Sequence, residues 1–246
     1  MNIIKTKSFE LAILSRGDCS APKLAILIPG RLDTKDYINF VSHAEYLTGN
    51  GFLAVAFDPP GVWGSPGGIE LYTTTNYIKA INELIEYFGD KPTLLLGHSR
   101  GAAAAILASS NINVIGVVSV MANFGAPTVP SGEAQGKGFE ITRRDLPPGG
   151  TPTKERKEFT LPIAYWDDGK KYNTIETLKK CIKPKLIVCG TTDQFTTPDE
   201  VKNLYKMIPE PKMIKEINCN HDYRYYLGAI QEVEEALGQF LYRYKL

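Results

Sequence analysis

The segment Gly97-His98-Ser99-Arg100-Gly101 places a serine between two glycines with the spacing G-x-S-x-G. An apolar run, residues 93–96, precedes this segment and an Ala-rich stretch follows it. A chain that turns directly from a strand into a helix exposes the residue at the corner, and flanking glycines let the two elements approach closely. The hydroxyl of Ser99 would then lie beside the free N–H groups of a helix N-terminus, which favour a developing negative charge. This context predicts that Ser99 is a nucleophile, and the alternative is a glycine-rich connection with an idle serine.

A serine hydroxyl is a weak nucleophile and needs a general base. The chain has three histidines, of which His221 lies in a loop directly after an apolar run. We predict that His221 is the base, the alternative being a capping or surface histidine. His98 adjoins Ser99, so its side chain should point away from the hydroxyl as a packing residue. His43 falls within a predicted helix and is expected to be structural or at the surface.

An acidic group must orient the imidazole and stabilise its charged form. Asp193 follows the apolar run 185–189, at the strand ends of a parallel sheet where ligands and catalytic groups gather. We predict that it is this acid, the alternative being an aspartate in the N-terminal turn of a helix. Asp222 is a competitor, but its adjacency to His221 makes ring-to-carboxylate geometry poor. Asp58 is expected to hold its own loop.

The elements that would position these residues follow an alternating pattern of apolar runs and helical periodicity. Such alternation predicts β-α-β units and a mostly parallel sheet. After one or two strands within residues 2–16, buried strands are expected at 23–28, 52–57, 93–96, 113–120, 185–189 and 212–217. Helices are expected at 36–50, 74–88, 99–110, 198–207 and 225–243.

The stretch 126–180 interrupts this pattern, because Pro and Gly become frequent and apolar periodicity is lost. We therefore predict a core formed by residues 1–125 and 181–246, with a cap or lid inserted between them at 126–180. A hairpin is expected in this insertion, with strands at 137–144 and 159–166. Four aromatic side chains could line an acyl pocket or simply pack the cap onto the core, namely Phe139, Phe159, Tyr165 and Trp166.

Bulk composition excludes several classes of partner. The 28 basic and 27 acidic residues nearly cancel, so no net field indicates nucleic acid. No apolar run is long enough to span a bilayer, and the N-terminal residues lack the apolar segment of a signal peptide. The four cysteines show no CxxC spacing, so reduced thiols, no metal site and a cytoplasmic location are expected.

Taken together, these motifs resemble the α/β-hydrolase superfamily over nearly the whole chain. The segments that carry the resemblance are 29–31, 56–65, 97–101, 190–198 and 220–222. The resemblance implies an α/β-hydrolase fold, a mostly parallel central sheet flanked by helices, with a small cap insertion. The order serine, aspartate, histidine agrees with it. Pro29 is a departure, because many members have histidine there, and it puts the shape of that loop in question.

The family pattern also implies an oxyanion hole formed by two backbone N–H groups. These belong to Arg100, which follows the nucleophile, and to Arg31, in the loop after strand 23–28. The side chain of Arg31 is then free either to reach an anionic or phenolic part of a substrate or to pair with Asp33 or Asp36.

The resemblance implies hydrolysis of a small-molecule carboxylic ester through an acyl-enzyme, without a cofactor. The insertion is similar to that of cinnamoyl and feruloyl esterases, and serine aminopeptidase-like members are also similar. Two alternatives stay open: a peptidase or amidase of the same fold, and a catalytically silent protein that binds a small molecule or a partner. An aspartate nucleophile is disfavoured because position 99 is serine. The oligomeric state is left open, with a dimer among the options.

Overall fold

One eight-stranded sheet organises the computed structural model, which describes residues 2–124 and 129–246. Its strand order is β1-β2-β4-β3-β5-β6-β9-β10, and among these strands only the pairs β1–β2 and β2–β4 are antiparallel. From β4 to β10 all the strands are parallel. The strands are β1 Asn2–Lys5, β2 Glu10–Arg16, β3 Lys23–Ile28, β4 Phe52–Phe57, β5 Thr93–His98, β6 Val114–Val120, β9 Lys185–Gly190 and β10 Lys212–Ile217.

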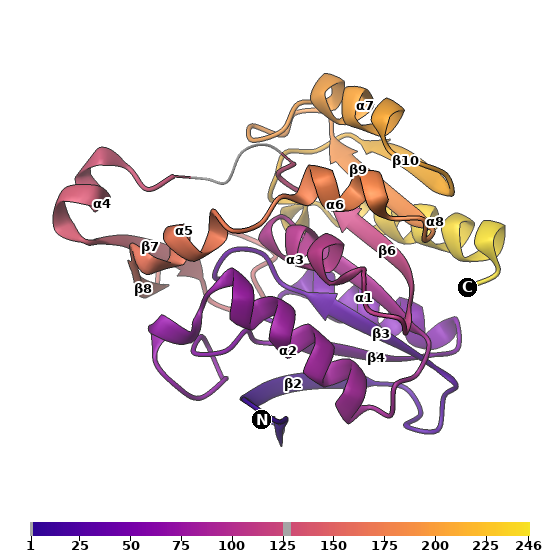
Figure 1. Cartoon of the computed structure of the whole chain (residues 1–246), viewed down its shortest axis with the longest axis horizontal. Helices are drawn as coiled ribbons and strands as arrows, with labels where there is room; N and C mark the ends of the chain where they lie inside the picture. The colour runs from indigo at the N-terminus through magenta and orange to yellow at the C-terminus, as the bar shows by residue number, and fades with distance from the viewer. Residues whose placement is uncertain (1, 125–128) are drawn as a thin grey trace.

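Helices cover both faces of this sheet because its central strands are apolar on both sides (Figure 1). One face packs on α2 Thr74–Tyr87, α3 Arg100–Ala108, α6 Thr174–Lys180 and α7 Pro198–Met207. The other face packs on α1 Ile38–Gly49 and α8 Leu227–Tyr244. Short 3-10 turns lie at Ile69–Leu71 and at Tyr223–Tyr225. Among the described helices, none is long and apolar enough to cross a membrane.

A smaller unit projects from the sheet between β6 and α6 (Figure 1). It consists of α4 Gly132–Lys137, the antiparallel hairpin of β7 Phe139–Asp145 and β8 Arg156–Pro162, and α5 Ala164–Gly169. Its apolar side chains form a third buried cluster with loops of the core. The members of this cluster are Leu32, Val62, Tyr72, Phe159, Leu161, Tyr165 and Trp166. We call the segment 129–173 the cap.

Two sequence expectations for this region need correction. The second hairpin strand ends at Pro162 rather than at residue 166, and α5 follows at once. The change occurs at Ile163, whose carbonyl accepts from the Trp166 N–H at 2.9 Å in the first helical turn. The α6 helix falls inside the predicted insertion, but its Leu178 packs in the core cluster of α2 and α3. The boundary of the cap is therefore better drawn before α6, while residues 126–128 of the prediction lie outside the described residues.

Candidate active site

The turn at Ser99 joins β5 directly to α3. Its backbone has φ 52° and ψ −116°, a positive φ that L-residues adopt only under local strain. The neighbouring glycines explain how the turn fits. A Cβ at Gly101 would lie 2.0 Å from the carbonyl oxygen of Ile28, and one at Gly97 would lie 2.3 Å from the backbone of Gly101. The tight spacing predicted from the motif is thus enforced by backbone-to-backbone contact.

A continuous chain of hydrogen bonds links Ser99, His221 and Asp193. The Ser99 Oγ lies 2.8 Å from His221 Nε2, and His221 Nδ1 lies 3.0 and 3.1 Å from the two carboxylate oxygens of Asp193. A carboxylate only accepts, so Nδ1–H donates to Asp193 and Nε2 of the neutral ring accepts from the serine hydroxyl. Both partners of the imidazole therefore favour the tautomer that a general base requires.

The loop after β9 holds Asp193 in its charged form. Burial alone would raise the pKa of Asp193, but the hydrogen bonds that its carboxylate accepts from His221 and from the N–H groups of Phe195 and Thr196 lower it. The Phe195 N–H donates to the carboxylate at 2.8 Å, and the Phe195 ring packs edge-on against the His221 ring at 4.6 Å. Sequence reasoning did not identify Phe195, which carries no motif of its own.

The other two histidines lie outside this hydrogen-bonded chain. His98 is buried, and its Nε2–H donates to the backbone carbonyl of His221 at 2.9 Å. It is therefore more than a packing residue, because it contacts the segment that carries the candidate base. His43 is a structural residue in α1, held by Glu234 at 3.0 Å and by the Tyr223 hydroxyl at 2.9 Å.

The two loops predicted to supply oxyanion donors meet beside Ser99. Arg100 is the first residue of α3, so its N–H has no partner within the helix. Arg31 follows β3, whose end is packed against Gly101, and both arginines line the same cavity as Ser99. The Arg31 side chain pairs with Glu140 of the cap and not with Asp33 or Asp36, the pairing that was one of the two alternatives expected for it. The physical reason is that the cap hairpin lies over this loop and brings Glu140 to the guanidinium.

The remaining acidic candidates have structural partners. Asp58 accepts from Thr34 Oγ1 at 2.7 Å and from the Gly64 N–H at 3.0 Å, so it holds two loops together rather than its own alone. Asp222 lines the cavity, with a carboxylate oxygen 3.6 Å from the Arg224 guanidinium.

The sequence of residues 25–236 matches the Alpha/beta hydrolase family. The chain belongs to this family. Three solved structures share its fold at low identity. Est1E from Butyrivibrio proteoclasticus, with ferulic acid bound, is 19% identical with a TM-score of 0.76, over 100% of this chain and 99% of that one. Mouse alpha/beta hydrolase domain-containing protein 10 is 18% identical with a TM-score of 0.76, over 98% of each chain.

The third structure is the monoacylglycerol lipase of Paleococcus ferrophilus. It is 21% identical with a TM-score of 0.75, over 96% of this chain and 99% of that one. A search of curated proteins finds no match.

In this α/β hydrolase, a cavity of about 280 Å³ opens beside Ser99 and His221. Tyr165 and Trp166 of α5, two of the four aromatic candidates, line it and also belong to the buried cluster between the cap and the core. Phe139 and Phe159 are not among the described residues of its wall. Phe159 is turned into the cap–core contact, where its ring packs at 5.5 Å on Trp63, and Phe139 lies at the hairpin surface with 36% of its area exposed.

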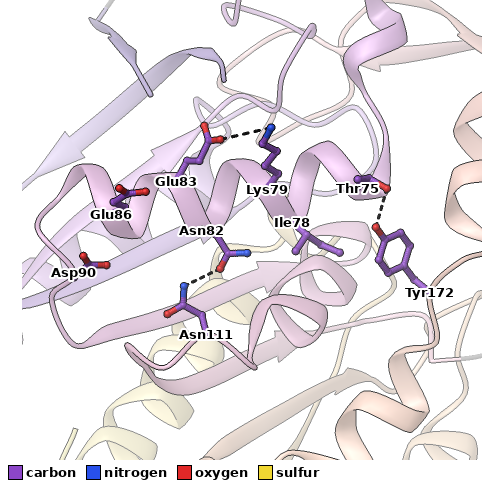
Figure 2. Close-up of a pocket in the computed structure, with 9 residues that line it drawn as sticks. All are labelled: Thr75, Ile78, Lys79, Asn82, Glu83, Glu86, Asp90, Asn111 and Tyr172. Atoms are coloured by element: carbon purple, nitrogen blue, oxygen red, sulfur yellow. Dashed lines mark hydrogen bonds and ion pairs between the residues drawn. The ribbon is translucent and has the colours of Figure 1, made fainter. Parts of the chain in front are cut away.

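A second hollow, of about 490 Å³, lies on the outer face of α2 (Figure 2). Its lining is a set of polar helix side chains with partners of their own, such as Asn82 with Asn111 and Thr75 with Tyr172. Glu83 in this hollow accepts from the hydroxyls of Thr6 and Ser8 at 2.7 and 2.6 Å. No described residue of this surface resembles a nucleophile with a base, so the chemistry is better placed in the smaller cavity.

Proposed function

We propose that this α/β hydrolase cleaves carboxylic esters through an acyl-enzyme intermediate. The observation that carries the proposal is the unbroken hydrogen-bond chain from the Ser99 hydroxyl through His221 to Asp193. Ser99 Oγ attacks the ester carbonyl while His221 Nε2 takes its proton, and Asp193 stabilises the imidazolium that forms. The backbone N–H groups of Arg31 and Arg100 bind the oxyanion.

The second half of the reaction uses the same groups in reverse. His221 donates its proton to the departing alkoxide, which leaves as the alcohol and gives the acyl-enzyme. His221 then activates a water that attacks the acyl carbon, and the carboxylic acid departs as Ser99 recovers its proton. No step of this scheme needs a cofactor.

Two features favour a small-molecule ester as the substrate. One relative in fold was solved with ferulic acid bound and another is named a monoacylglycerol lipase. The cavity beside Ser99 has the size for a small molecule, and the Tyr165 and Trp166 rings give it aromatic walls. A paired assay with an ester and an anilide of the same acid separates esterase from amidase activity.

The test of this function is the variant Ser99→Ala assayed on p-nitrophenyl acetate. We expect kcat/KM to fall by about 10⁴-fold or more, because removing a nucleophile that acts in concert with a base abolishes the covalent route. Ser110→Ala, an exposed serine just beyond α3, is the matched control and should keep full activity. A fluorophosphonate probe should label the wild type and Ser110→Ala but not Ser99→Ala. Retained turnover in Ser99→Ala would overturn the proposal, and a silent protein would show no labelling at all.

A further inference from the structure

The side chain of Arg100 is a cation in the cavity without a carboxylate partner. Its guanidinium donates to the Thr74 hydroxyl, and the guanidinium carbon lies 4.7 Å from the centre of the Tyr165 ring. None of its ion pairs or hydrogen bonds in the described part of the chain involves an acidic group, and residues 1 and 125–128 include no acid. A guanidinium is always charged and carries five N–H donors, so most of its donors remain for a ligand or water.

The other two arginines of the cavity are matched by acids. Arg31 pairs with Glu140, and the Arg144 Nε lies 3.6 Å from an Asp33 carboxylate oxygen. Asp222 is the one acid among the described residues of the wall, and it lies 3.6 Å from Arg224, whose nearer acid is Asp145 at 2.9 Å. Among the described residues of the wall, Arg100 is therefore the one arginine whose guanidinium contacts no acid.

The guanidinium of Arg100 is also held in place before any ligand arrives. Thr74 at the start of α2 and the Tyr165 ring in α5 fix it from two sides, and the Tyr165 ring stacks in turn on Tyr72 at 5.5 Å. A cation whose orientation is set by packing loses little entropy on binding.

We infer that the substrates of this cavity carry an anionic group, a carboxylate or a phosphate, which the Arg100 side chain binds. The inference rests on the proposed ester hydrolysis and narrows its substrate class. It differs from the oxyanion role of Arg100, which uses the backbone N–H and is independent of the side chain.

The test compares esters that differ only in charge. The first pair places the charge on the leaving alcohol and compares 4-acetoxybenzoate with the neutral 4-acetoxybenzamide. In a parallel assay, 4-acetoxyphenyl phosphate replaces the carboxylate by a phosphate. The second pair places the charge on the acyl side, as monomethyl adipate against its monoamide. We expect kcat/KM of the wild type to favour the anion of at least one pair by about tenfold or more, as charge-assisted hydrogen bonds do. The larger of the two preferences tells which side of the ester carries the charge.

In the variant Arg100→Gln, the ratio of kcat/KM for the charged ester to kcat/KM for the neutral ester should fall to about one. Arg100→Lys should keep part of the preference for the charged ester. Arg16→Gln, which removes an equal charge from the exposed end of β2, should leave the preference unchanged. Equal rates for the charged and neutral members of both pairs would overturn the inference. So would a preference that persists in Arg100→Gln.

A binding measurement separates this inference from the proposed function. Calorimetry on Ser99→Ala should show tighter binding of 4-acetamidobenzoate than of 4-acetamidobenzamide, and the double variant with Arg100→Gln should lose the difference. Absence of ester turnover together with this binding preference would refute the esterase proposal and keep the anion site. Equal binding of the two amides to Ser99→Ala would count against the anion site, whatever the esterase result.

Discussion

His98 lies next to Ser99 in the chain, yet its side chain contacts the backbone of His221. Its Nε2–H donates to the His221 carbonyl at 2.9 Å, and its ring lies 5.1 Å from the His221 ring. We expect His98 to act as a positioning residue that keeps the imidazole aligned with Ser99. Changing His98→Phe should lower kcat on p-nitrophenyl acetate by about tenfold, because small misplacements of a general base are costly, and KM should change little.

Two further variants test this role of His98. In His98→Gln a side-chain amide can donate to the same carbonyl, so part of the lost kcat should return. His43→Gln disturbs another buried histidine, which is bonded to Glu234 and Tyr223, and should lower stability while keeping kcat. If His98→Gln and His98→Phe lose kcat equally, the hydrogen bond has no part in positioning.

At the scale of single residues, motif spacing predicted that Ser99, Asp193 and His221 meet, because each stands at a fixed place relative to a strand end, and hydrogen bonds join the three. Their neighbours were harder to predict. The His98 contact with His221 spans 123 residues and the Arg31 pair with Glu140 spans 109. No local pattern encodes such pairs, since they depend on how distant loops meet. For that reason, Asp33 and Asp36 were offered as one alternative for the partner of Arg31, whereas its partner is Glu140.

The contact between the turn at Ser99 and the end of β3 is a property of two elements. A methyl group at Gly101 would meet the carbonyl oxygens of Ile28 and Pro29 at 2.0 and 2.4 Å. Gly101→Ala must therefore push apart the loops that carry both proposed oxyanion donors. We expect a loss of about 1–3 kcal/mol in the free energy of unfolding, together with a lower kcat. Urea unfolding and ester turnover measure the two effects.

Gly228→Ala is the matched control, because nothing lies within 4 Å of the added methyl group in α8. The lower entropy of the unfolded chain should leave this variant as stable as the wild type or more stable, by up to about 1 kcal/mol. Equal stability of the two glycine variants would show that the close approach at Gly101 is not a real constraint.

The buried Asp33 joins the loop after β3 to the cap strand β7 through Arg144. Burial alone would raise the pKa of Asp33, but Arg144 and His98 lower it to about 2, from an ordinary value of 3.8. Since the pKa of Asp33 is lower in the folded state than in the unfolded state, the charged carboxylate makes its full contribution to the free energy of unfolding above about pH 4. This contribution, about 2 kcal/mol, is lost as the pH falls towards 2. The stability difference between wild type and Asp33→Asn should therefore shrink by about that amount between pH 5 and pH 2, as measured by urea unfolding. A difference independent of pH would contradict this account.

The elements themselves were predictable to different degrees. Central strands such as β3 and β4 are continuous apolar runs, so their positions followed from the sequence. The cap hairpin has alternating exposed and half-buried positions, which gives weaker signals at its ends. This weak signal explains why the second strand was expected to reach residue 166, whereas it ends at Pro162. Packing of α6 in the core depends on Leu178 meeting α3, which periodicity alone does not indicate.

For the whole molecule, the question is whether the cap and the core unfold together. The cap packs on core loops through a buried apolar cluster, and the Tyr37 hydroxyl and the Arg224 guanidinium bind Asp145 at 2.8 and 2.9 Å. Both tryptophans of the chain lie at this contact: Trp166 is buried in α5, and the Trp63 indole donates to the Leu32 carbonyl at 2.8 Å. Tryptophan fluorescence therefore reports on cap docking, while far-ultraviolet circular dichroism reports mainly on the sheet and its helices. In the wild type the two urea transitions should coincide, as they do for one cooperative unit.

Leu161→Ala should separate the two transitions. Leu161 is fully buried in the cap cluster, so its truncation leaves a cavity that costs about 2–5 kcal/mol. That loss falls on the contact between the cap and the core, whereas the sheet keeps its own two apolar faces. Fluorescence should then change at a lower urea concentration than circular dichroism. Coincident transitions that move together in Leu161→Ala would instead mean that the sheet cannot persist without the docked cap, and the cap would have to be treated as an integral part of the core.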